Sequence, residues 1–212
     1  MSNPMRLTRA LVDRLPPRTA TQILLELDQP ATLWVFAVGS LIWSPRFEVA
    51  ERRAARVIGW RRSFCLGPDR RFRGSPSAPG IMLSLDRGGE CQGVVLLMQP
   101  SDLHTAVVAL MKAEPPVPPQ WVHAETDAGP VNAIAFTADP TSILHCPEPP
   151  LDELADLLAS SVGFVGTMAE YLLNTITELE KAGIHDPHLW QLQTMVAERL
   201  ERLRERVIES KT

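Results

Sequence analysis

Short strand-like segments dominate residues 32–138 of this 212-residue chain, and helical patterns follow them. Between residues 32 and 138, runs rich in Val, Ile, Phe and Trp alternate with Gly, Pro and Asp, as in short strands joined by turns. Five or more such strands favour a barrel or a strongly curled sheet. We expect strands at 32–36, 55–58, 61–66, 81–85, 93–98, 121–125 and 131–136.

One helix interrupts the predicted strands, and three more follow them. Ser101 is the expected N-cap of the first helix, whose apolar face carries Leu103, Val107 and Leu110. Helical spacing returns in three segments, at 151–160, 167–182 and 185–210. Gly183 stands where the second of these segments should end. The last segment alternates charges and spaces its leucines helically, which predicts an exposed amphipathic helix; a partner-binding or dimer role is the second interpretation.

A helical N-terminal extension at 1–30 is predicted ahead of a single domain at 31–212. Three leucines at helical spacing precede the pair Pro16–Pro17, which ends the pattern, and a second short helix is expected at 21–27. The length suits one domain with a substantial buried core.

Charge and hydropathy narrow the classes of partner. The formal net charge of −4 argues against a general nucleic-acid binder, and eight arginines between residues 52 and 73 are interpreted as a solvated face of the barrel. Apolar stretches are too short to cross a bilayer, and no apolar leader is evident, so we expect a cytoplasmic protein. The three cysteines form no CxxC pair, which predicts neither a metal site nor a disulfide framework.

The exit of the first predicted strand offers a binding site made of backbone groups. Gly39 follows a buried strand and lets the chain turn sharply, so the N–H groups of Gly39, Ser40 and Leu41 can converge. Such a cradle holds a carboxylate or a developing oxyanion. An ordinary turn at a strand end is the alternative interpretation.

Several motifs follow one another along the chain: WVFAVGSLIW at 34–43, RSFCL at 62–66, FRGSPSAPG at 72–80, CQGV at 91–94, GTMAEYL at 166–172 and GIHDPHL at 183–189. In order and spacing they resemble the ChaC-like γ-glutamylcyclotransferases. That family typically has a strand ending in FGYGSLIW, an HRGTP-x-x-PG loop, a C-x-GV strand and a GxNxEYL helix. The resemblance covers about residues 33–195.

This resemblance implies an α+β fold, a mixed β-barrel surrounded by helices, with C-terminal helices. It also implies a reaction in which the α-amine of a γ-glutamyl group attacks its own γ-carbonyl. The products are 5-oxoproline and an amine; glutathione is the usual substrate, and Cys-Gly is then the other product. No metal or organic cofactor is implied.

The resemblance also implies the residues of the site. The family's catalytic glutamate follows the helix after the central strand, and Glu114 holds that position here. A carboxyl group with a raised pKa in a partly apolar pocket can take a proton from the amine and return one to the departing nitrogen. A solvated residue at a helix C-terminus is the alternative for Glu114. The implied substrate-binding residues are Val35, Phe36, Ala37, Val38, Gly39, Ser40, Leu41, Arg73 and Tyr171. Arg73 is alternatively a structural ion-pair partner.

Several polar positions of the family's pattern are replaced, while its glycine, proline and core positions are kept. The replacements are Val38 for Tyr, Phe72 for His, Ser77 for Glu, Ala113 for Arg and Met168 for Asn, and the segment 115–120 is rich in proline. Three functions therefore remain open. The chain is a cyclotransferase for glutathione that relies on backbone donors and Glu114, a cyclotransferase for another γ-glutamyl amine, or a non-catalytic relative that binds partners on the same scaffold.

Overall fold

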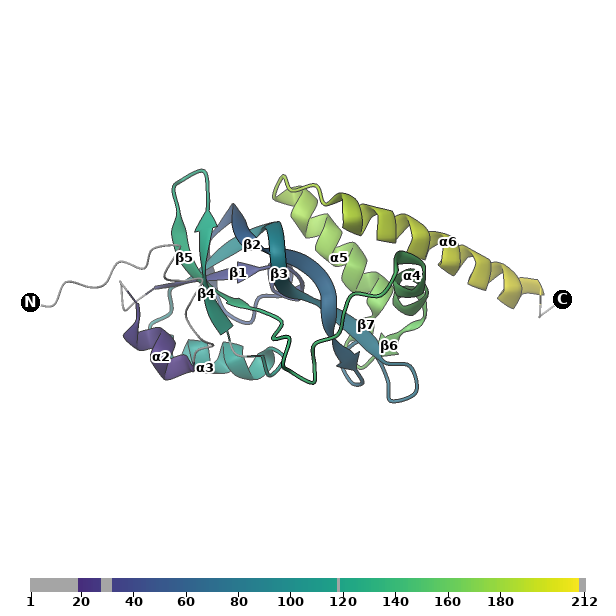
Figure 1. The fold of residues 1–212 in the computed structure, drawn as a ribbon, viewed down its shortest axis with the longest axis horizontal. Helices are drawn as coiled ribbons and strands as arrows, with labels where there is room; N and C mark the ends of the chain where they lie inside the picture. The colour runs from purple at the N-terminus through teal and green to yellow at the C-terminus, as the bar shows by residue number, and fades with distance from the viewer. Residues whose placement is uncertain (1–18, 28–31, 118, 210–212) are drawn as a thin grey trace, which may run out of the picture.

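The computed structural model describes residues 19–27, 32–117 and 119–209, and a closed β-barrel forms the body of this part of the chain (Figure 1). The strand order is β1-β3-β2-β4-β5. Strand β1 runs antiparallel to β3 and parallel to β5, so the barrel is mixed, as predicted. The strands are β1 Leu33–Ala37, β2 Val49–Asp69, β3 Gly80–Met98, β4 Pro119–Glu125 and β5 Val131–Phe136.

Two of the strands are much longer than the sequence pattern indicates. The segments predicted at 55–58 and 61–66 belong to one strand, β2, and those at 81–85 and 93–98 belong to β3. The prediction is wrong here because it treats a glycine as the end of a strand. Gly59 instead has a φ of 88° beside a register shift between Ile58 and Trp60, which marks a bulge within a continuing strand.

Helices cover the barrel at two places (Figure 1). The helices are α2 Ala20–Leu25, α3 Leu103–Ala113, α4 Leu151–Ser160, α5 Met168–Lys181 and α6 Pro187–Glu209, and a short hairpin of β6 Val162–Gly163 and β7 Gly166–Thr167 precedes α5. The predicted cap of α3 is wrong by one residue. Asp102, not Ser101, is the N-cap, and its carboxylate accepts the Thr105 N–H at 3.1 Å. Most of the predicted extension at 1–30 lies outside the described residues, and its boundary with the domain stays a prediction.

Helix α6 leaves the body of the protein in its second half (Figure 1). Leu189, Leu192 and Val196 are buried, whereas Leu200 and Leu203 are exposed. The predicted amphipathic helix is therefore present.

The hydrophobic core divides into two clusters on opposite faces of the strands. Val35 and Ala37 of β1 belong to the larger cluster, which includes residues from all five helices. Phe36 belongs to the smaller cluster, which consists of residues in or next to the strands. Successive side chains of a strand point to opposite faces, so β1 contributes to both clusters.

Not every arginine of the predicted solvated face is solvated. The side chains of Arg62 and Arg73 are 5% and 6% exposed, and each makes an ion pair, with Asp186 and Glu170 respectively. Their partners lie about a hundred residues further along the chain, where the local pattern gives no sign of them.

Close packing at Gly93 generates a prediction about stability. A Cβ atom there would lie 2.7 Å from the Ala37 carbonyl oxygen and 2.8 Å from Phe36 Cζ. We expect Gly93→Ala to lower the free energy of unfolding by about 1–3 kcal/mol, because overpacking forces neighbours to shift. Gln92→Ala, at the exposed neighbouring side chain, should change it by less than about 0.5 kcal/mol. Urea unfolding measures both, and equal midpoints for the two variants would contradict the packing argument.

Candidate active site

The chain turns sharply where β1 ends. Val38 and Gly39 lead into a single 3₁₀ turn, Ser40–Ile42, in which the Ile42 N–H donates to the Gly39 carbonyl at 2.9 Å. The N–H groups of Gly39, Ser40 and Leu41 precede that donor, so they occupy the positions of a helical turn that lack partners within it.

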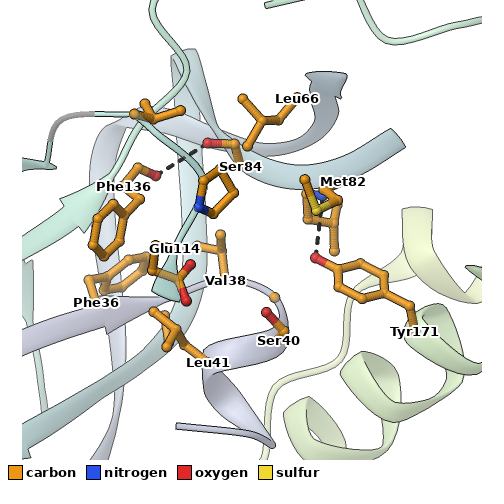
Figure 2. A pocket seen from close by; sticks show the side chains of 15 residues that line it. Phe36, Val38, Ser40, Leu41, Leu66, Met82, Ser84, Glu114, Phe136 and Tyr171 are labelled. Carbon is orange, nitrogen blue, oxygen red and sulfur yellow. Dashed lines mark hydrogen bonds between the residues drawn. The ribbon is translucent and has the colours of Figure 1, made fainter. Parts of the chain in front are cut away.

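Glycine is required at position 39 because Tyr171 approaches it closely. A Cβ atom at Gly39 would overlap the Tyr171 hydroxyl oxygen. The same oxygen accepts the Leu83 N–H at 3.3 Å, so Tyr171 joins helix α5 to β3 and to the turn after β1 (Figure 2). Burial raises the pKa of Tyr171, which keeps its hydroxyl protonated.

A proline places the candidate acid at the end of α3. Glu114 is the C-cap, and its own N–H donates to the Leu110 carbonyl at 3.1 Å. Its backbone is extended, with φ −81° and ψ 160°, because Pro115 disfavours the helical conformation in the residue before it. Figure 2 shows the carboxylate of Glu114 among Phe36, Val38, Ser40 and Leu41.

A cavity brings the β1 turn and the end of α3 together. The space between its lining atoms is about 520 Å³, a volume that includes open solvent. Its lining residues are Phe36, Ala37, Val38, Gly39, Ser40, Leu41, Leu66, Met82, Leu83, Ser84, Glu114, Pro115, Val117, Phe136 and Tyr171. The wall is mainly apolar, and Glu114 is the ionisable group suited to proton transfer near neutral pH.

The surroundings of Glu114 suit it to proton transfer. Burial raises the pKa of its carboxyl group from the ordinary 4.5 to about 7, and the positive charge of Arg46 opposes this only partly. Near neutral pH both protonation states are populated, so the group can accept a proton and return it.

Most of the residues predicted for the site line the cavity, and two do not. Phe36 through Leu41, Glu114 and Tyr171 are lining residues, whereas Val35 and Arg73 are not. Val35 is fully buried in the larger core cluster. Arg73 donates to the Thr167 carbonyl at 3.1 Å and to Glu170 Oε2 at 3.3 Å. Its guanidinium carbon also lies 5.5 Å from the ring centroid of Tyr171. This geometry matches the alternative interpretation of Arg73 as a structural ion-pair partner, which supports the Tyr171 ring.

Sequence reasoning missed the apolar side of the cavity. These residues are Leu66, Met82, Leu83, Ser84, Pro115, Val117 and Phe136. They come from β2, β3, β5 and the segment after α3, and no local pattern distinguishes them from ordinary core residues. Only the closure of the barrel brings them to one place.

No group of three or more metal-ligating side chains occurs in the part of the chain that the structure describes. Within the same residues, no helix is both long and apolar enough to cross a membrane.

The family model of ChaC-like proteins matches residues 33–199, and the chain belongs to this family. The glutathione-specific gamma-glutamylcyclotransferase of Escherichia coli (strain K12) is 34% identical to it over 168 residues, 77% of this chain and 72% of that protein. Glutathione-specific gamma-glutamylcyclotransferase 1 of Homo sapiens is 29% identical over 170 residues, 76% of each protein.

The fold has a close match among solved structures. The crystal structure of the yeast gamma-glutamyl cyclotransferase specific to glutathione aligns with a TM-score of 0.69 at 20% sequence identity. The match covers 79% of this chain and 96% of the yeast chain. The predicted fold class is therefore confirmed.

The raised pKa of Glu114 makes stability depend on pH in a defined direction. Because the pKa in the folded state, about 7, exceeds the ordinary 4.5, the protonated carboxyl contributes stability below pH 4.5 that is lost as pH rises through 7. The neutral amide of Glu114→Gln avoids this loss. We expect Glu114→Gln to raise the melting temperature, relative to wild type, more at pH 8 than at pH 5. Glu153→Gln, at an exposed site, serves as the control; an equal effect of Glu114→Gln at both pH values would refute the assignment.

The contact between Gly39 and Tyr171 predicts an energetic coupling. We expect Gly39→Ala to destabilise the protein by about 1–3 kcal/mol, since the new methyl group meets the Tyr171 hydroxyl. The same substitution should cost less in a Tyr171→Phe background, where that oxygen is gone. Thermal unfolding of the four proteins in this double-mutant cycle gives the coupling, and strictly additive effects would show that the two residues do not interact.

Proposed function

We propose that this protein is a cytoplasmic γ-glutamylcyclotransferase that cleaves glutathione to 5-oxoproline and Cys-Gly. One observation carries the proposal: the Glu114 carboxyl group lines the same cavity as the backbone turn at Gly39 and Ser40. Membership of the ChaC-like family and the names of the relatives from Escherichia coli and Homo sapiens support the same substrate.

The backbone turn supplies the recognition of the γ-glutamyl group. In this proposal the N–H groups around Gly39 hold the substrate's α-carboxylate or stabilise the negative charge on the γ-carbonyl oxygen. Fixed N–H dipoles in a mostly apolar cavity stabilise such a charge more strongly than water does, because they need no reorganisation during the reaction.

Glu114 supplies the proton transfers. Its carboxylate takes a proton from the α-ammonium group, and the freed amine attacks the γ-carbonyl carbon to close a five-membered ring. The bond between that carbon and the peptide nitrogen then breaks, and the carboxyl group returns its proton to the departing nitrogen. The ring nitrogen then gives its second proton to the Glu114 carboxylate, which passes it to the released amine, so a neutral lactam and an ammonium group are formed. With these two transfers the proton count balances, and one residue with a pKa of about 7 can carry out both.

The replaced side chains bear on this chemistry less than their number indicates. Val38 stands where the family has tyrosine, and it lines the cavity through an apolar side chain. The neighbouring N–H groups belong to the backbone and do not depend on side-chain identity. The competing proposal is a non-catalytic binding protein on the same scaffold, since each lost hydrogen-bond donor removes about 1 kcal/mol of binding.

Release of 5-oxoproline tests the proposal directly. We expect the purified protein to release 5-oxoproline from glutathione, with a rate that falls below about pH 7 as the Glu114 carboxylate becomes protonated. Glu114→Gln should lower the rate by about 10²-fold or more, because proton transfer is lost. Glu153→Gln is the matched control on the surface. A panel of γ-glutamyl dipeptides tests other leaving amines.

Two results would redirect the assignment. Release from another γ-glutamyl amine but not from glutathione would change the substrate. A folded protein that releases 5-oxoproline from none of these compounds would favour the binding protein.

A further inference from the structure

Arg62 on β2 makes three hydrogen bonds that the proposed chemistry does not use. Its Nε donates to the Val38 carbonyl at 2.9 Å, and Nη2 donates to the Gln92 carbonyl at 2.6 Å. Nη1 is paired with Asp186, in the connection between α5 and α6. The Arg62 side chain is 5% exposed, so these three partners fix its position.

The Val38–Gly39 peptide links Arg62 to the active-site cavity. Val38 and Gly39 line the active-site cavity, and Arg62 does not. Arg62 instead lines a second cavity, together with Gln92 and Asp186.

The geometry of that peptide transmits the contact. The Val38 carbonyl and the Gly39 N–H belong to one planar trans unit, so they point in opposite directions. When Arg62 holds the carbonyl, the N–H of Gly39 therefore points away from Arg62. Glycine at position 39 has no side chain to restrict rotation of the peptide, so an external contact has to do so.

We propose that Arg62 is a positioning residue that fixes the Val38–Gly39 peptide so that its N–H points at the γ-glutamyl group of the substrate. The inference rests on the proposed function for the identity of that ligand. Asp186 neutralises the guanidinium, so Arg62 acts through the peptide and not through its charge.

The fork shape of the guanidinium explains why arginine is needed. Three acceptors from separate segments surround it: a backbone carbonyl after β1, a backbone carbonyl in β3 and a carboxylate before α6. Lysine offers one ammonium group at the end of a flexible stem and cannot reach all three in this arrangement. The carboxylate partner would retain the ammonium, because an ion pair is the strongest of the three contacts. The Val38 carbonyl would then lose its donor.

Arg62→Lys tests the proposal, and Arg199→Lys is the matched control. Arg199 also donates to several acceptors, among them Asp156 and the Met195 carbonyl, but it belongs to α6, reaches α4 and lines neither of the two cavities. We expect both variants to lower the melting temperature. Only Arg62→Lys should lower kcat/KM for glutathione, by about tenfold or more, as expected for one misdirected hydrogen bond to a charged group.

Two further measurements separate positioning from a structural role. In a Glu114→Gln background, which prevents turnover, Arg62→Lys should weaken glutathione binding by about tenfold, and Arg199→Lys should leave it unchanged. In the protein without ligand, the ¹⁵N–¹H signal of the Gly39 amide should shift with Arg62→Lys and not with Arg199→Lys.

The outcomes distinguish the inference from the function on which it rests. If Arg62→Lys changes only the melting temperature, as Arg199→Lys does, Arg62 is a structural residue and the inference is overturned. If the wild-type protein neither binds glutathione nor releases 5-oxoproline, the proposed function fails; the Gly39 amide signal then decides alone whether Arg62 fixes the peptide.

Discussion

The arrangement of the site depends on the packing of the Tyr171 hydroxyl against Gly39. This contact joins α5 to the turn after β1 and, through the Leu83 N–H, to β3. Trp43 and the Arg73 guanidinium pack against the tyrosine ring and hold it in place. The C-terminal helices therefore do more than cover the barrel. They determine where the backbone donors of the first strand's exit lie, since a bulkier residue at position 39 could not accept the tyrosine.

A second constraint is a local one at the end of α3. Pro115 ends the helix by excluding helical backbone at Glu114, and the carboxylate is thereby directed into the cavity and not along the helix axis. The apolar wall then raises the pKa of the carboxyl group. The position of the Glu114 carboxylate thus follows from the proline after it, and its raised pKa follows from the barrel that closes around it.

Local chemistry allowed much of this to be predicted from the sequence. The bounds of α4 and β5 follow from apolar spacing, and the roles of Gly39 and Glu114 as cavity residues follow from the ordered motifs around them. The failures are long-range. Nothing near Gly59 tells a bulge from a strand end, because the partner strand decides between them. Arg62 is paired with Asp186, which lies 124 positions away. Because the residues near Arg62 give no sign of this partner, its sequence neighbourhood predicts an exposed side chain.

Arg62 lines a second cavity and also donates to the carbonyl of Val38, which lines the active-site cavity. The second cavity has its own polar lining, including Glu148 and His188, and it opens to solvent. A compound bound there would contact Arg62, which holds the carbonyl of Val38. It would need no likeness to a γ-glutamyl group, and raising the substrate concentration would not displace it. Given the positioning role proposed for Arg62, such a compound would inhibit non-competitively, a route that a search confined to substrate mimics would overlook.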